Sequence, residues 1–135
     1  MRRVFLDSNV LFTAAHNPKG KAAFLCELGG EGYWELCTSA YAAEEARRNI
    51  AVKFPDCLGR FEKLISRLTV VSSGTGQSCP IDLPEKDRPV FEAAARCGAT
   101  HLLTGDRKHF GPFMDRADLP SGIIIQTVAK FIEKI

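Results

Sequence analysis

The chain has 135 residues, of which 45% are hydrophobic and 25% are charged, and its formal net charge at pH 7 is +2. This length and composition are ordinary for a globular protein with a buried core, and they predict a single domain over residues 1–135. The small net charge does not indicate a nucleic-acid-binding protein by itself, and no apolar stretch is long enough to span a membrane.

Apolar segments with strand and helix patterns alternate along the chain. The first, residues 4–6 (VFL), is a run typical of a strand buried on both faces of a parallel sheet. Further strands are expected at residues 33–38, 69–71, 99–104 and 123–125. Helices are expected at residues 11–15, with Ser8 or Asn9 as the cap, and at residues 21–28, 40–54, 57–68, 85–97 and from 128 onward. This alternation predicts parallel pairing in a three-layer α/β/α sandwich with a central, mainly parallel sheet.

Two segments lack a helix or strand pattern. Residues 72–84 are rich in Ser, Gly and Pro, and Gly74 and Gly76 raise the question of a phosphate-binding loop. No Gly-Lys-Ser/Thr follows them and no helix begins there, so we expect an ordinary surface loop. Residues 107–120 are expected to be rich in turns.

The five cysteines give no sign of a disulfide framework or a zinc site. They are odd in number and irregularly spaced, and no CxxC pair occurs among positions 26, 37, 57, 79 and 97. This usage predicts small buried side chains in a reducing compartment. Asp7 interrupts the apolar run that a signal peptide would need, so we expect a cytoplasmic protein.

Acidic residues follow two of the expected strands. Asp7 comes directly after the strand at residues 4–6, and Asp106 closely follows the strand at residues 99–104. The carboxyl ends of parallel strands meet at one edge of a sheet, which is where ligands bind in α/β proteins. Other acids that can reach this edge lie near the starts of helices: Glu44, Glu45 and Asp87. Such a cluster repels itself unless a hard cation such as Mg²⁺ or Mn²⁺ neutralises it.

Each acid also has a purely structural explanation. Asp7 can cap the helix that follows it, and Asp87 can interact with a helix dipole. Asp106 can be a turn residue after Thr104-Gly105. At least one of Glu44 and Glu45 is expected to be a solvated helix charge.

Three segments resemble the PIN-domain family: LDSNVL (residues 6–11), TSAYAAEEARRNI (38–50) and KDRPVFEAAARCGATHLLTGD (86–106). The resemblance covers nearly the whole chain, including IIIQTVAKFIEKI at residues 123–135, and its most specific part runs from Asp87 to Asp106. It implies a PIN-like fold and the activity of VapC-type toxins and related nucleases, which cut RNA with Mg²⁺ or Mn²⁺.

The resemblance also implies roles for particular residues. The catalytic and metal-binding acids would be Asp7, Glu45, Asp87 and Asp106, with Glu44 as an alternative to Glu45; Ser8, Asn9 and Thr104 would orient the carboxylates or a water molecule. Many members carry a further acid shortly after the position of Asp106. Here that region reads Arg107-Lys108-His109, so the number of metals, one or two, stays open. His109 is either a residue that faces substrate or, as is more common for a lone His, an ordinary surface residue.

The expected function is a metal-dependent endoribonuclease that hydrolyses RNA phosphodiester bonds, with an antitoxin protein and a second copy of the chain as candidate partners. One alternative is a non-catalytic RNA- or protein-binding module with the same fold. Another is a phosphotransferase of the haloacid-dehalogenase type, but that chemistry needs a second Asp where Asn9 stands.

Basic residues give a weaker indication of RNA binding. Five of them flank the acidic positions and could neutralise phosphates: Arg47, Arg48, Arg88, Arg107 and Lys108. No aromatic platform for stacking bases is evident in the sequence.

Overall fold

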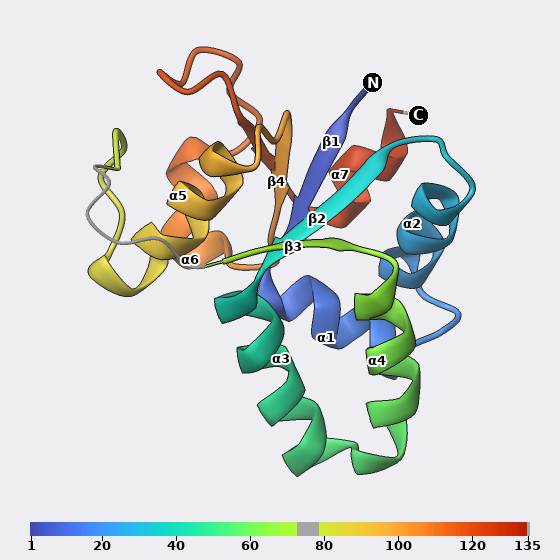
Figure 1. The fold of residues 1–135 in the computed structure, drawn as a ribbon. Helices are drawn as coiled ribbons and strands as arrows, with labels where there is room; N and C mark the ends of the chain where they lie inside the picture. The colour runs from blue at the N-terminus through green and yellow to red at the C-terminus, as the bar shows by residue number, and fades with distance from the viewer. Residues whose placement is uncertain (73–78, 135) are drawn as a thin grey trace.

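A five-stranded parallel sheet forms the centre of the protein in the computed structural model, which describes residues 1–72 and 79–134 (Figure 1). The strands are β1 (Arg3–Leu6), β2 (Glu35–Ser39), β3 (Thr69–Val71), β4 (His101–Leu103) and β5 (Ile124–Gln126). Their order in the sheet is β3-β2-β1-β4-β5, and all four neighbouring pairs are parallel. β2 and β3 extend the sheet on one side of β1, and β4 and β5 extend it on the other. The strand order therefore reverses beside β1. Ligands bind at such a reversal in open α/β sheets.

Helices cover both faces of the sheet, which confirms the predicted three-layer architecture (Figure 1). One layer contains α1 (Ser8–His16), α2 (Lys21–Gly30), α3 (Ala40–Lys53), α4 (Leu58–Ser66) and α7 (Val128–Glu133); the other contains α5 (Arg88–Arg96) and α6 (Arg107–Phe110). Short 3₁₀ turns at Pro55–Cys57, Glu85–Asp87 and Gly111–Phe113 complete the secondary structure of the described residues.

The first strand is buried on both faces, as its apolar sequence predicts. Val4 and Leu6 contact the core beneath the larger helix layer, whereas Phe5 contacts the core beneath α5. Successive side chains of a strand point to opposite faces, so an all-apolar strand can serve two cores at once. This burial fixes where β1 ends and therefore where Asp7 lies.

The structure differs from the sequence predictions at several boundaries. Helix α1 begins at Ser8, earlier than predicted, because its cap is Asp7, the structural role considered for that residue, and not Ser8 or Asn9. The loop at residues 72–84 is not simply a surface loop, since Ile81 and Leu83 are buried beneath α5. Gly74 and Gly76 lie outside the described residues. Residues 107–120 are rich in turns, as predicted, but they also contain the four-residue helix α6.

All five cysteines are free thiols, and the sulfur atoms of Cys37 and Cys97 lie 2.8 Å apart. Three of them, Cys26, Cys37 and Cys97, are buried, as expected for small apolar side chains. Among the helices described, none combines the length and apolar character needed to cross a lipid bilayer.

Candidate metal centre

Asp7 lies where β1 ends, at the edge of the sheet where the strand order reverses. Its backbone N–H donates to the Leu103 carbonyl at 3.1 Å, which continues the pairing of β1 with β4. One carboxylate oxygen, Oδ1, accepts a hydrogen bond from the Ser8 backbone N–H at 2.7 Å. The other, Oδ2, accepts from Thr104 Oγ1 at 2.8 Å and from Asn9 Nδ2 at 3.3 Å. Asp7 is therefore a helix cap, and only 6% of it is exposed.

Burial raises the pKa of Asp7 above its ordinary value, and the neighbouring negative charges of Glu45 and Asp87 raise it further. The hydrogen bonds from Thr104 and Ser8 act in the opposite direction but do not offset this effect. A carboxylate in such a place destabilises the folded chain at neutral pH unless a cation lies beside it.

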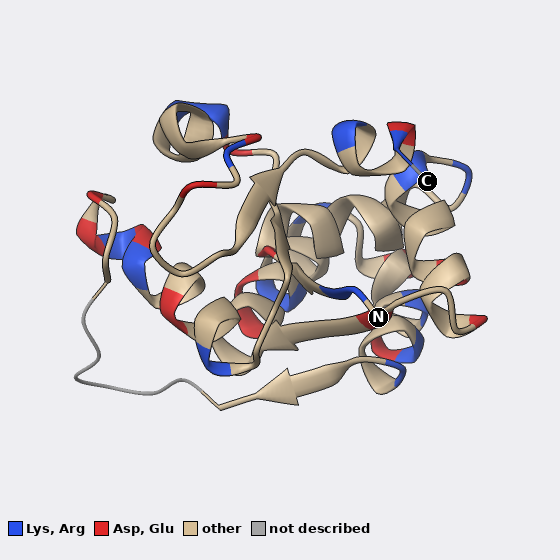
Figure 2. Cartoon of the chain, turned by 90° about the horizontal axis from the view of Figure 1, so that it is seen from above, with Lys and Arg blue, Asp and Glu red and all other residues tan. Residues whose placement is uncertain are grey.

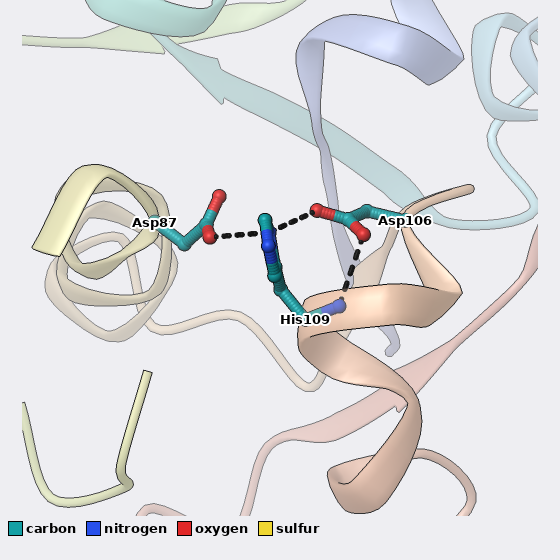
Figure 3. A group of neighbouring side chains, drawn as sticks. All are labelled: Asp87, Asp106 and His109. Carbon is teal, nitrogen blue, oxygen red and sulfur yellow. Dashed lines mark hydrogen bonds and ion pairs between the residues drawn. The ribbon is translucent and has the colours of Figure 1, made fainter. Parts of the chain in front are cut away.

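Asp87 and Asp106 lie on either side of His109 (Figure 3). Asp106 caps α6 by accepting from the His109 backbone N–H at 3.1 Å, and its Oδ2 is hydrogen bonded to His109 Nδ1 at 3.0 Å. The same Nδ1 atom is 2.9 Å from Asp87 Oδ2, which is an ion-pair distance without hydrogen-bond direction. Asp87 Oδ2 is buried and accepts no hydrogen bond from any described residue. A buried carboxylate oxygen without a donor costs free energy, and a bound cation would offset that cost.

Helix α3 brings one of the two adjacent glutamates toward these aspartates. The helix is capped by Ser39, whose Oγ accepts from the Ala42 N–H at 3.0 Å. Ser8 Oγ donates a hydrogen bond to Glu45 Oε1, which connects α1 to α3. Glu44 instead pairs with Arg47 at 2.9 Å and with Arg48 at 3.7 Å.

The four acids named from the sequence all line one cavity of about 170 Å³, the acid cavity. Glu44 does not line it. The cavity is bounded by Asp7, Ser8, Asn9, Tyr41, Glu45, Lys86, Asp87, Val90 and Asp106. The acids come from four separate segments: the ends of β1 and β4, the second turn of α3 and the residue that precedes α5. The structure thus brings the predicted residues together, while their catalytic roles stay a prediction.

The three small polar residues predicted to orient the acids all make hydrogen bonds within this cluster. Ser8 bonds to Glu45, and Asn9 Nδ2 donates to Asp7 while its Oδ1 accepts from the Gly105 N–H at 2.7 Å. Thr104 is fully buried behind the cavity, where its Oγ1 donates to Asp7 and accepts from the Asp106 N–H at 3.1 Å. These contacts connect two of the acids, Asp7 and Asp106, through a single hydroxyl group.

The donor set suits a divalent cation. Carboxylate oxygens are the ligands that Mg²⁺ and Mn²⁺ prefer, and Asp87 Oδ2 accepts no hydrogen bond from a described residue, although it lies 2.9 Å from His109 Nδ1. Ligand atoms of Asp87, Asp106 and His109 also lie within 4.8 Å of one another. The sequence leaves His109 as a substrate-facing or a surface residue, and the structure places its ring nitrogen against two carboxylates. The sequence signal for this contact is that His109 lies three residues after Asp106, because side chains at that spacing meet on a helix.

None of the five basic residues considered from the sequence lines the acid cavity. Arg47 forms a bidentate contact with Glu62 at 2.8 and 3.0 Å, and Arg88 Nε donates to the Leu83 carbonyl at 3.0 Å. Basic and acidic residues are interspersed along the chain (Figure 2). The sequence interpretation missed Lys86 and Tyr41 as lining residues, although one adjoins Asp87 and the other lies one helical turn before Glu45.

Metal-free protein should show the cost of ionising Asp7. Because the folded pKa of Asp7 lies above its value in the unfolded chain, the associated stability is present at low pH and is lost as the pH rises through the folded pKa. Asp7→Asn cannot ionise, so its melting temperature relative to wild type should increase with pH and exceed that of wild type at neutral pH. Thermal melts of both proteins in EDTA, from about pH 4 to about pH 8, measure this difference.

The role of Asp7 as a helix cap gives this comparison a second possible outcome. Replacement by Asn leaves one acceptor for the bonds from Ser8 and Thr104, and loss of a cap costs about 1 kcal/mol. A constant deficit of the variant at every pH would show that Asp7 acts mainly as a cap. Added Mn²⁺ should raise the melting temperature of wild type more than that of the variant.

Comparison with known proteins supports the fold assignment. The sequence matches no protein-family model and no curated protein. Solved structures resemble the chain over most of its length, among them the following three. VapBC2 from Rickettsia felis, bound to a DNA fragment from its promoter, has a TM-score of 0.67 and 14% identity, covering 93% of this chain and 98% of that chain. DNA-bound VapBC from Salmonella typhimurium has a TM-score of 0.67 and 18% identity, covering 95% and 99%.

The third structure is a single toxin. It is Mycobacterium tuberculosis VapC20, described as a sarcin–ricin loop cleaving toxin, with a TM-score of 0.54, 8% identity and coverage of 78% of this chain and 91% of that chain. Structural similarity at such low sequence identity shows that the backbones are arranged alike. It does not show that the proteins share an activity. In agreement with the motifs in its sequence, the chain has a VapC-like PIN-domain fold.

Proposed function

We propose that this protein is a metal-dependent endoribonuclease that hydrolyses RNA phosphodiester bonds at the cavity lined by Asp7, Glu45, Asp87 and Asp106. The observation that carries the proposal is the convergence of these four carboxylates, from four segments, on one cavity at the reversal of strand order. A phosphodiester is an anion and would be repelled by uncompensated acids, so the site requires cations to accept it.

The four acids would hold Mg²⁺ or Mn²⁺. Such an ion, when bound, activates water and neutralises charge on the phosphate. The other residues keep the acids in place: Thr104 holds Asp7 and the backbone of Asp106, and Ser8 holds Glu45. Lys86, an exposed cation at the cavity, is positioned to attract the phosphate.

The neighbours in fold support an RNA substrate and a protein partner. One of them, VapC20, is a toxin that cleaves the sarcin–ricin loop, and two others are VapBC complexes bound to DNA. By analogy, this chain would be the toxin of a toxin–antitoxin pair that acts on RNA in the cytoplasm, with an antitoxin protein and a second copy of the chain as partners.

The rival functions are less consistent with the site. A haloacid-dehalogenase type phosphotransferase needs an acid at position 9, where Asn9 instead holds the Gly105 backbone and the Asp7 carboxylate. A non-catalytic binding module has no need for four carboxylates that converge on one cavity and repel one another.

Metal dependence tests the proposal directly. Purified protein should cleave RNA with Mg²⁺ or Mn²⁺, lose cleavage in EDTA, and recover it when metal is added in excess. The measurement is a gel of end-labelled RNA, with a thermal-shift titration of the same metals as a readout of binding alone. Undiminished cleavage in EDTA would contradict the proposal.

A further inference from the structure

We infer that a single strand of RNA crosses the acid cavity along a continuous groove, and that Tyr41 stacks on one of its bases. The inference rests on the proposed function and specifies how the substrate is held. The surfaces that would hold the strand lie on either side of the acids.

Three adjoining hollows follow one another along the carboxyl edge of the sheet. The acid cavity shares Tyr41 and Glu45 with a hollow of about 360 Å³ on the exposed side of α3. It shares Asn9 with a hollow of about 400 Å³ between α1, α2 and α7. Because neighbouring hollows share residues, an extended chain can enter from one side, pass over the acids and leave on the other.

Tyr41 stands at the junction between the acid cavity and the α3 hollow. It is 40% exposed and lies one helical turn before Glu45, on the same stripe of α3. Among the described residues, no aromatic ring packs against it, unlike Tyr33, whose ring centroid lies 6.4 Å from that of Trp34. An exposed ring beside a nucleic-acid site offers a face on which a base can stack.

Cations flank the acids along this groove. Arg48 lines the α3 hollow, and its side chain is 71% exposed and only loosely paired, at 3.7 Å from Glu44. Lys86 lines the acid cavity, and Lys21 lines the hollow on the other side. This pattern suits a polyanion whose flanking phosphates meet cations while the scissile phosphate lies over the metal site. Stacking on Tyr41 requires an unpaired base, which favours single-stranded RNA over a duplex.

The test measures binding without cleavage. In an Asp106→Asn background that keeps the RNA intact, Tyr41→Ala should weaken the affinity for a short, unstructured, fluorescein-labelled RNA by about 5–150-fold, the range expected for one stacked base. Tyr41→Phe keeps the ring and should retain the affinity. Tyr33→Ala removes an aromatic ring that is 64% exposed and does not line the groove, so it is the matched control and should change nothing. Fluorescence anisotropy in Mn²⁺ gives the dissociation constants.

Each contrary result has a distinct meaning. If Tyr41→Ala binds as tightly as its parent, or if Tyr41→Phe loses as much affinity as Tyr41→Ala, stacking on Tyr41 is wrong while the proposed nuclease stands. If Tyr41→Ala alters the sedimenting mass and leaves RNA affinity unchanged, the surface belongs to a protein interface and the inference is overturned. In otherwise wild-type enzyme, Tyr41→Ala should raise KM more than it lowers kcat. Cleavage with no measurable preference for single strands over duplex also contradicts the inference.

Discussion

Asp106→Asn should reduce RNA cleavage at least about 100-fold, because a ligand to a catalytic metal contributes several kcal/mol to the transition state and each 1.4 kcal/mol is about tenfold in rate. The fold should survive the change. Asn keeps an oxygen that can accept the 3.1 Å hydrogen bond from the His109 N–H, so the cap of α6 remains. Single-turnover cleavage in saturating Mn²⁺, with circular dichroism on the same sample, measures both outcomes.

Asp118→Asn is the matched control for this substitution. Asp118 is another aspartate, but its side chain is 69% exposed, pairs with Arg116 at 2.8 Å and does not line the acid cavity. The ion pair is exposed to solvent and Asp118 is not at the acid cavity, so both the fold and cleavage should match those of wild type. Equal cleavage by wild type and Asp106→Asn would remove Asp106 from the set of metal ligands.

The layers of the fold could be predicted because they depend on patterns local in sequence. An all-apolar β1 requires a core on each face, and alternation with helices requires parallel pairing. The burial of Ile81 and Leu83 could not be predicted in the same way. These residues lie in a segment of turn-forming composition, and α5, which begins at Arg88, covers them only once the chain has folded.

The acids could be predicted as a group, but their supporting contacts could not. Asp7 and Asp106 follow strands that are adjacent in the sheet, and that adjacency follows from topology. The single hydroxyl of Thr104 between them depends on side-chain orientations that no sequence pattern encodes. Sequence patterns present capping and metal binding by Asp7 as alternatives, whereas in the structure one carboxylate both caps α1 with Oδ1 and lines the acid cavity.

Glu45→Gln should disable cleavage and weaken Mn²⁺ binding, whereas Glu44→Gln should do little. Adjacent residues on a helix point about 100° apart, so the two glutamates cannot face one metal equally well. The structure places Glu45 at the cavity and pairs Glu44 with Arg47 and Arg48. Glutamine retains an oxygen that can accept from Ser8, so the contact between α1 and α3 should persist. Isothermal titration with Mn²⁺ and single-turnover cleavage compare the two variants.

The two substitutions are chemically identical and differ by one position, so each variant is the control for the other. Loss of the exposed pairs of Glu44 should cost only a few tenths of a kcal/mol in stability, which a melting curve can verify. A decrease in Mn²⁺ affinity in Glu44→Gln alone would mean that α3 presents the opposite face to the metal. Loss in both variants would indicate that overall negative charge on α3 attracts the cation and that neither side chain is a specific ligand. Loss in Glu45→Gln alone would identify a direct ligand, since the two variants carry the same net charge.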